Sequence, residues 1–178
     1  MAACGASEIQ VVNDTGQDVT VEVGSKSVAV PSSWNHALLK AKLKAGDKIV
    51  VKQGERVLEE LPLTAEHRKQ NVVLNVKGAG DFYLVEYTKA YVAENQPDAK
   101  LPDRPFEVVA ALAGKSLTVS PAGVLVEYTG ALPTKIAHGQ RVFRIENVPR
   151  SLATRGVDDY LMRSFETDLK MRRFIYSP

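Results

Sequence analysis

The sequence contains very little cysteine, and this scarcity excludes two classes of protein. Of the 178 residues only Cys4 is a cysteine, so the chain cannot form an internal disulfide or a cysteine-based structural zinc site. The three histidines, His36, His67 and His138, lie far apart in the sequence. They show none of the local spacings typical of metal ligands. We therefore expect no metal site and no cofactor.

Long apolar runs and an excess of one charge are also missing. No stretch approaches the roughly 18 consecutive apolar residues that indicate a membrane-spanning helix. The 23 basic and 21 acidic residues nearly cancel, leaving a formal charge of +2, whereas nucleic-acid-binding domains are usually strongly basic. We expect neither a transmembrane helix nor a nucleic-acid partner. The apolar content of 44% is that of an ordinary globular protein, with one domain or two small ones.

Recognisable catalytic motifs are missing as well. The chain has no Gly-x-Ser-x-Gly and no His-Glu-x-x-His. Residues 113–116 read Ala-Gly-Lys-Ser, like the end of a phosphate-binding loop, but Val109 stands where that motif needs a glycine. Residues 117–119 also read as a strand, whereas the motif must open a helix. Residues 13–15 match a glycosylation sequon, for which a turn is a sufficient explanation. We predict a non-enzymatic protein; an active site assembled from distant residues is the alternative.

The sequence does contain many short segments in which apolar and polar residues alternate. Val19, Val21 and Val23 alternate with polar residues, the period expected of a half-buried strand. In residues 39–44 three apolar residues alternate with three lysines, a pattern that favours an edge strand because charge discourages pairing with another molecule. Turn-forming residues separate such segments every 8–12 residues or so. This rhythm predicts an antiparallel β-sandwich over residues 8–92.

The composition changes after residue 92. Residues 93–105 are polar and include three prolines, so they form a semi-rigid linker, which either separates two domains or wraps around one. Residues 106–178 are predicted to form a smaller α+β domain, with strands at 106–112, 117–119, 124–128 and 141–148. A helix is predicted at about 158–173, because apolar residues recur there at every fourth position. The fold class is thus mainly β with a C-terminal helix.

Four aromatic residues are candidates for a partner-binding surface. Tyr83, Tyr87 and Tyr91 would share one face of a single strand if residues 82–92 are extended. Trp34 lies in a predicted loop. Tyrosine and tryptophan are enriched at the energetic centres of protein interfaces, although ordinary sheet packing would also explain them. We take these four residues as candidate contacts to a protein partner.

The N-terminus, Met1-Ala2-Ala3-Cys4-Gly5, resembles the end of a bacterial lipoprotein signal. In that family the cysteine becomes the lipidated first residue of the mature protein, so the resemblance implies lipid attachment at Cys4. The basic and apolar parts of a signal peptide are missing, and an added start methionine in place of the signal would explain this. The alternative is a cytoplasmic protein in which Cys4 is an incidental thiol near the chain end.

Residues 13–91 resemble small β-sandwich modules of bacterial cell envelopes, of the PEGA or transthyretin-like kind. The resemblance rests on residues 19–23, on the run at 43–51 and on Leu74-Asn75-Val76. It implies a noncatalytic adhesion, scaffolding or assembly module with an Ig/transthyretin-like fold. We therefore predict a structural or binding component of the envelope, in the periplasm and anchored to the outer membrane. The alternatives are a cytoplasmic protein-interaction module and a β-sandwich that binds or hydrolyses a small ligand.

Overall fold

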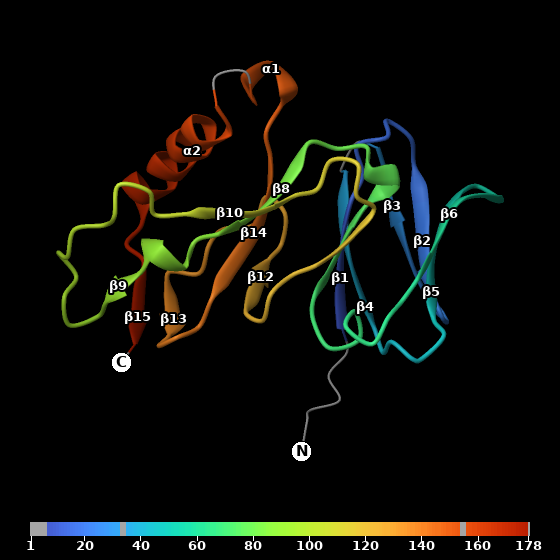
Figure 1. Ribbon diagram of the computed structural model, residues 1–178, viewed down its shortest axis with the longest axis horizontal. Helices are drawn as coiled ribbons and strands as arrows, with labels where there is room; N and C mark the ends of the chain where they lie inside the picture. Colours follow the sequence, from blue (N-terminus) through green and yellow to red (C-terminus); the bar gives the residue numbers. More distant parts are fainter. Residues whose placement is uncertain (1–6, 33–34, 154–155, 178) are drawn as a thin grey trace. The chain divides into compact units, whose positions relative to one another are not determined.

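The computed structural model describes residues 7–32, 35–153 and 156–177 of the chain (Figure 1). The described chain is mainly β, as predicted, and carries a helix near its C-terminus. It divides into two compact units. Unit 1 comprises Met1–Gly80 and Leu112–Ala122, and unit 2 comprises Asp81–Ala111 and Gly123–Pro178. Each unit has a hydrophobic core of its own.

Unit 1 is built from two four-stranded sheets. One sheet has the order β11-β7-β1-β4 and the other the order β3-β2-β5-β6. β1 lies between β4, to which it is antiparallel, and β7, to which it is parallel. The strands are β1 (Ser7–Val12), β2 (Val19–Val23), β3 (Lys26–Val30), β4 (His36–Ala41), β5 (Lys48–Gln53), β6 (Arg56–Pro62), β7 (Val72–Asn75) and β11 (Leu117–Val119).

Alternation in the sequence explains how these strands form one core. Val19, Val21 and Val23 are buried in β2, whereas the two residues between them are half-exposed. Buried residues of both sheets, such as Ile9 of β1 and Val51 of β5, belong to a single hydrophobic cluster. β4 lies at the edge of its hydrogen-bonded sheet, as predicted, but it contains only one of the three lysines on which that prediction rested, Lys40. It ends at Ala41, earlier than the alternation in the sequence suggests.

Unit 2 combines two small sheets with the C-terminal helix. The sheet orders are β10-β8-β14-β12 and β13-β15-β9. Two single-turn 3-10 helices interrupt the chain, at Val76–Gly78 in unit 1 and at Thr88–Ala90 in unit 2. The remaining elements of unit 2 are β8 (Phe82–Glu86), β9 (Val92–Ala93), β10 (Glu107–Ala111), β12 (Val124–Val126), β13 (Lys135–Ala137), β14 (Val142–Asn147), α1 (Arg150–Ala153), α2 (Val157–Met171) and β15 (Ile175–Ser177).

The long helix α2 confirms the helix predicted near the C-terminus. Its apolar stripe places Leu161 and Phe165 at 0% exposure in the core of unit 2. Asp158 and Asp159 lie in the first turn, where negative charge offsets the positive end of the helix dipole. The residue preceding the helix is Gly156, with φ of 99°, a value that favours glycine. Asp158 therefore lies inside the first turn and not at the capping position.

The division of the chain differs from the one predicted at residues 92 and 105. β8 and β9 belong to unit 2, and Leu112–Ala122 returns to unit 1, where β11 pairs with β7. The proline-rich segment 93–105 lies within unit 2, between β9 and β10. The division differs because strands far apart in the sequence pair with one another. β8 takes β10 and β14 as neighbours, and no local pattern in the sequence specifies such partners.

Candidate functional site

The three candidate tyrosines occupy different environments, because β8 ends at Glu86 and a 3-10 turn follows it. Tyr83 lies in β8 and is half-buried. Tyr87 is 0% exposed and Tyr91 is 6% exposed. The Tyr87 hydroxyl donates to Glu146 Oε1 at 2.7 Å, and the Tyr91 hydroxyl donates to the carbonyl oxygen of Pro133 at 2.6 Å. The expectation of one shared tyrosine face is therefore replaced by two core residues and one partly accessible ring.

The two core tyrosines belong to a row of aromatic rings that the helix α2 completes. The Tyr87 and Phe165 rings stack with centroids 5.8 Å apart, and Phe165 stacks on Phe174 at 6.2 Å. The Tyr91 and Phe174 ring centroids lie 5.3 Å apart. Such contacts add about 0.5–1.5 kcal/mol each beyond the area that they bury. The apolar stripe of α2 is thus used for packing inside unit 2.

Two other candidates, Cys4 and Trp34, lie outside the described residues. Ser7, the first residue of β1, follows Cys4 by three positions. Three extended residues span at most about 11 Å.

A buried cation, Arg144 in β14, is the centre of the most enclosed polar cluster in unit 2. Its side chain is only 8% exposed. Nε donates to Glu146 Oε1 at 2.5 Å, Nη1 to the carbonyl oxygen of Gly130 at 3.1 Å, and Nη2 to Asp168 Oδ2 at 3.3 Å. The guanidinium also lies 5.2 Å from the centre of the Tyr87 ring, within the range of a cation–π contact. All three guanidinium nitrogens therefore have a partner.

The electrostatics of this cluster hold each group in one protonation state. Burial by itself lowers the pKa of Arg144, but the charge of Glu146, the phenol of Tyr87 and the charge of Asp168 outweigh it and raise that pKa. Burial and then the nearby Glu146 carboxylate raise the pKa of Tyr87 well above its usual range. Arg144 therefore stays charged and Tyr87 stays protonated near neutral pH. This arrangement suits a structural clamp better than proton transfer.

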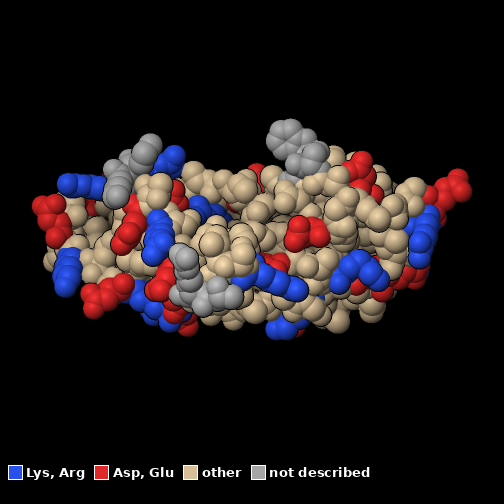
Figure 2. Space-filling model, turned by 90° about the horizontal axis from the view of Figure 1, so that it is seen from above, with Lys and Arg blue, Asp and Glu red and all other residues tan. Residues whose placement is uncertain are grey.

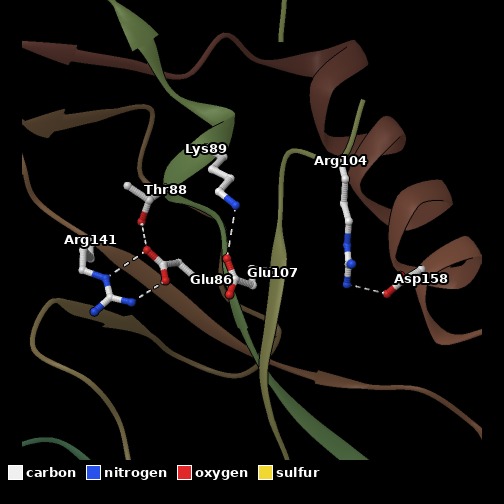
Figure 3. A network of polar contacts seen from close by, with 7 residues as sticks. All are labelled: Glu86, Thr88, Lys89, Arg104, Glu107, Arg141 and Asp158. Atoms are coloured by element: carbon white, nitrogen blue, oxygen red, sulfur yellow. Dashed lines mark hydrogen bonds and ion pairs between the residues drawn. The ribbon is translucent and has the colours of Figure 1, made fainter. Parts of the chain in front are cut away.

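A second polar group surrounds Glu86 at the end of β8 (Figure 3). Arg141 donates to the two oxygens of its carboxylate from Nε at 3.0 Å and from Nη2 at 2.5 Å, and Thr88 donates to Oε1 at 2.7 Å. The hydrogen bonds from Arg141 lower the pKa of Glu86; burial opposes this, and Thr88 adds to the lowering. Glu86 is therefore ionised, and both of its carboxylate oxygens accept hydrogen bonds.

Two further ion pairs in Figure 3 are more exposed. Lys89 and Glu107 are 3.2 Å apart, and Arg104 and Asp158 are 2.8 Å apart. More than half of each side chain is accessible to solvent. Exposed pairs of this kind contribute about 0–1 kcal/mol, because solvent screens them. They join strand β10 to the 3-10 turn at Thr88–Ala90, and the segment before β10 to α2.

Two cavities of different size are lined by described residues of unit 2. The larger, of about 510 Å³, lies along α2 next to α1 and is lined by Leu152, Gly156, Asp159, Tyr160, Arg163, Ser164 and Thr167. The smaller, of about 190 Å³, includes His138 and Tyr176 in its lining. Among the described residues no buried side-chain nitrogen or oxygen lacks a hydrogen-bond partner. In that part of the chain we also find no group of three or more potential metal ligands.

The segment that resembles the end of a phosphate-binding loop has a structural role in unit 1. Gly114, at φ of 75°, donates its N–H to the carbonyl oxygen of Gly78 at 2.9 Å. A Cβ atom on Gly78 would lie only 2.8 Å from the Gly114 carbonyl carbon, so the close approach requires glycine. A strand, β11, follows this loop, which agrees with the rejection of the phosphate-loop interpretation.

Two buried asparagines belong to segments noted in the sequence: Asn13 to the sequon at residues 13–15, and Asn75 to Leu74-Asn75-Val76. Asn13, the first residue of the sequon, is 1% exposed, and its Nδ2 donates to the carbonyl oxygen of Gln17 at 2.7 Å. Asn75 is also 1% exposed. Its Nδ2 donates to the carbonyl oxygens of Leu112 at 2.9 Å and Gly80 at 3.2 Å, and its Oδ1 accepts the Gly80 N–H at 3.2 Å. Both amides therefore hold turns together.

Comparison of the chain with protein-family models, with curated proteins and with solved structures finds no match. Sequence reasoning missed the Arg144 cluster. A usable signal was present, because Arg144 interrupts an otherwise apolar run in Val142-Phe143-Arg144-Ile145, and a charge at such a position needs buried partners. None of the described helices is long and apolar enough to cross a membrane.

Proposed function

We propose that this protein is a non-catalytic structural or binding module of a bacterial cell envelope, attached to a membrane by lipid at Cys4. The observation that carries the proposal is the short distance along the chain from Cys4 to the first strand. Only two residues, Gly5 and Ala6, separate the lipoprotein-like cysteine from Ser7. A lipid on Cys4 would thus hold unit 1 directly at the membrane surface.

The fold of unit 1 is consistent with the same assignment. We propose that its two sheets form a sandwich of the Ig/transthyretin-like kind, since they are antiparallel except for one parallel pair and share one core. Modules of that kind usually act through their surfaces. The closed hydrogen-bonding around Arg144 and Glu86 supports a role without catalysis, because those charged groups are engaged with one another.

The anchor is tested by membrane fractionation of the protein produced in a bacterium from a gene that encodes a lipoprotein signal ahead of Cys4. We expect the wild-type protein in the membrane fraction, released by detergent but not by high salt. Cys4→Ser should be soluble, and Ala6→Ser, a matched change two residues away, should behave like the wild type. If the wild-type and Cys4→Ser proteins are equally soluble, the anchor is refuted and a cytoplasmic interaction module becomes the better explanation.

The binding role is tested at Tyr83, the one candidate tyrosine that is partly accessible. We expect Tyr83→Ala to weaken recovery of a protein partner at least tenfold in crosslinking and affinity capture, with a change in Tm of only a few degrees. Tyr87→Ala serves as the contrast, since its fully buried ring should mainly affect Tm. If Tyr83→Ala lowers Tm as much as Tyr87→Ala and leaves capture unchanged, Tyr83 is a packing residue.

A further inference from the structure

One end of unit 1 carries an excess of positive charge. The pairing fixes which segments meet there. Ser7 at the start of β1 lies opposite Ala41 at the end of β4, and Val72 at the start of β7 lies beside Ile9. The loops 42–47 and 62–71 therefore both belong to this end, which is the lower end of β1 and β4 in Figure 1. The turn after β2 joins them, because Val23 lies opposite Ile49 near the start of β5.

We call this surface the basic end, and it is defined by the charged residues of those segments. Seven are basic and four are acidic, giving a formal charge of +3. The basic residues are Lys26, Lys40, Lys42, Lys44, Lys48, Arg68 and Lys69, and the acidic residues are Glu8, Asp47, Glu60 and Glu66.

Ion pairing reduces the charge of only part of the basic end. Lys40 pairs with Glu8 at 3.1 Å, and Lys48 pairs with Glu60 at 2.7 Å. Asp47 is occupied as well, because its Oδ2 accepts the Lys44 backbone N–H at 2.7 Å. Within the described residues the ion pairs of unit 1 do not involve the other five basic side chains. These are exposed: Lys26, Lys42, Lys44, Arg68 and Lys69.

The opposite end of unit 1 lacks this excess. There the charged residues of the described loops and of the start of β6 are Asp14, Asp18, Glu55, Arg56, Lys77 and Lys115, which sum to zero formal charge. Figure 2 views the molecule from the top of Figure 1, the side away from the start of β1. On the face that it draws, acidic and basic side chains are interspersed.

The basic end is also the place at which the chain reaches Cys4. The Ser7 hydroxyl donates to the carbonyl oxygen of Arg68 at 3.2 Å, so the beginning of β1 is attached to the 62–71 loop. Cys4 is within about 11 Å of Ser7 along the chain. Any surface to which Cys4 is attached would therefore face these lysines.

From this coincidence we infer that the basic end is a docking surface for anionic lipid head groups. The inference rests on the proposed function for its orientation, and it adds the chemistry of the membrane that the module contacts. Each Lys or Arg held near an anionic bilayer strengthens binding about fivefold, and the attraction decays within a Debye length of about 8–10 Å. Five exposed cations give strong attraction only if they face the bilayer together, as the geometry of this end allows.

The test measures binding of the purified, unlipidated chain to vesicles by co-sedimentation. At low ionic strength we expect binding to vesicles of phosphatidylcholine with phosphatidylglycerol, and at least tenfold weaker binding to vesicles of phosphatidylcholine alone. Lys42→Glu combined with Lys69→Glu should weaken binding to the anionic vesicles about thirtyfold or more. The matched control, Arg56→Glu with Lys115→Glu at the opposite end, changes the net charge equally and should retain most of the binding.

Four results would overturn the inference: no binding to anionic vesicles, equal binding to both lipid mixtures, equal losses in the two double variants, or a short DNA duplex that binds the same lysines as tightly as the vesicles do. Because this assay uses protein without lipid, its failure leaves the Cys4 fractionation result unaffected. Conversely, a soluble product in the fractionation experiment would refute the anchor without changing the vesicle result.

Discussion

At Asn75 one buried amide satisfies three backbone groups of two chain segments. The chain leaves unit 1 after Gly80 and returns to it at Leu112, and the amide bonds to the backbone of both residues. A buried backbone group left without a partner costs about 1–3 kcal/mol. The effect of removing the amide should therefore exceed that of a typical substitution.

We expect Asn75→Ala to lower the free energy of unfolding by about 2–4 kcal/mol, measured by urea denaturation. The control is Asn95→Ala, since Asn95 is exposed and its loss should cost less than about 0.5 kcal/mol. Similar stabilities for the two variants would show that the Asn75 hydrogen bonds are replaced by water.

Arg144 is also a buried hydrogen-bonding residue, and it carries a charge. We expect Arg144→Met to lower the free energy of unfolding by about 3–5 kcal/mol, because Glu146 would be left as a buried carboxylate without its cation. Arg144→Lys keeps the charge but cannot donate in three directions, so its loss should be intermediate. The comparison is made by urea denaturation at neutral pH. A Met variant more stable than the Lys variant would contradict the assigned role of the charge.

The Glu86–Arg141 pair predicts a pH dependence. The folded-state pKa of Glu86 lies below its ordinary value, chiefly through the hydrogen bonds from Arg141. A depressed carboxyl pKa stabilises the folded state above the unfolded pKa of about 4.3, and this stabilisation is lost as the pH falls through the folded value. The stability difference between wild type and Arg141→Met should thus be about 1 kcal/mol above pH 5 and shrink below it.

Urea denaturation between pH 7 and pH 3 measures this difference. The reference is Arg163→Met, because Arg163 is exposed and is not among the residues of the described ion pairs. Its effect should not change with pH. If the Arg141 and Arg163 variants show the same pH profile, Arg141 does not set the Glu86 pKa.

The residue scale also shows where sequence reasoning reaches its limit. Even spacing predicted one face for Tyr83, Tyr87 and Tyr91, but this holds only while the strand continues. The strand ends at Glu86, and the 3-10 turn at Thr88–Ala90 redirects the chain. Two aromatic rings bury Tyr87. They belong to Phe106 and Phe165, which lie 19 and 78 positions further along the chain. Local pattern cannot specify contacts at such separations.

At the scale of elements, the periodicity of apolar residues predicted the strands and the helix that bury one face. Alternation located β2, and a stripe at every fourth residue located α2. The elements that were missed, such as β13 and β15, have only three residues each. Three residues hold little alternation to recognise, although the equally short β11 was predicted at residues 117–119. β13 and β15 form because parallel neighbours supply their hydrogen bonds.

The role of α2 can be tested through its stripe. We expect Phe165→Ala to lower the free energy of unfolding by about 3–5 kcal/mol, since the ring is fully buried between Tyr87 and Phe174. Glu166→Ala, on the exposed side of the helix, should cost less than about 0.5 kcal/mol. Thermal and urea unfolding followed by circular dichroism measure both. A loss below 1 kcal/mol for Phe165→Ala would contradict the packing role of the stripe.

At the scale of the whole molecule, cleavage of the proline-rich segment 93–105 tests whether this segment separates two independent domains. A protease site inserted between Ala99 and Lys100 would divide the chain in an exposed stretch. β8 and β9 precede the cut, whereas their neighbours β10, β14 and β15 follow it. We expect the two fragments to co-elute in gel filtration under native conditions and to separate only in denaturant. Separation under native conditions would instead support a linker between two independent domains.

The pairing of β7 with β11 bears on how the protein is made. β11 ends at Val119, and it is separated in sequence from the rest of unit 1 by Asp81–Ala111. During translation the first sheet cannot be finished until about 120 residues have left the ribosome. By then the first strands of the other unit have emerged without β14, their later neighbour. The nascent chain thus holds two incomplete sheets at once, a period in which unpaired strand edges are open to chaperones or to aggregation.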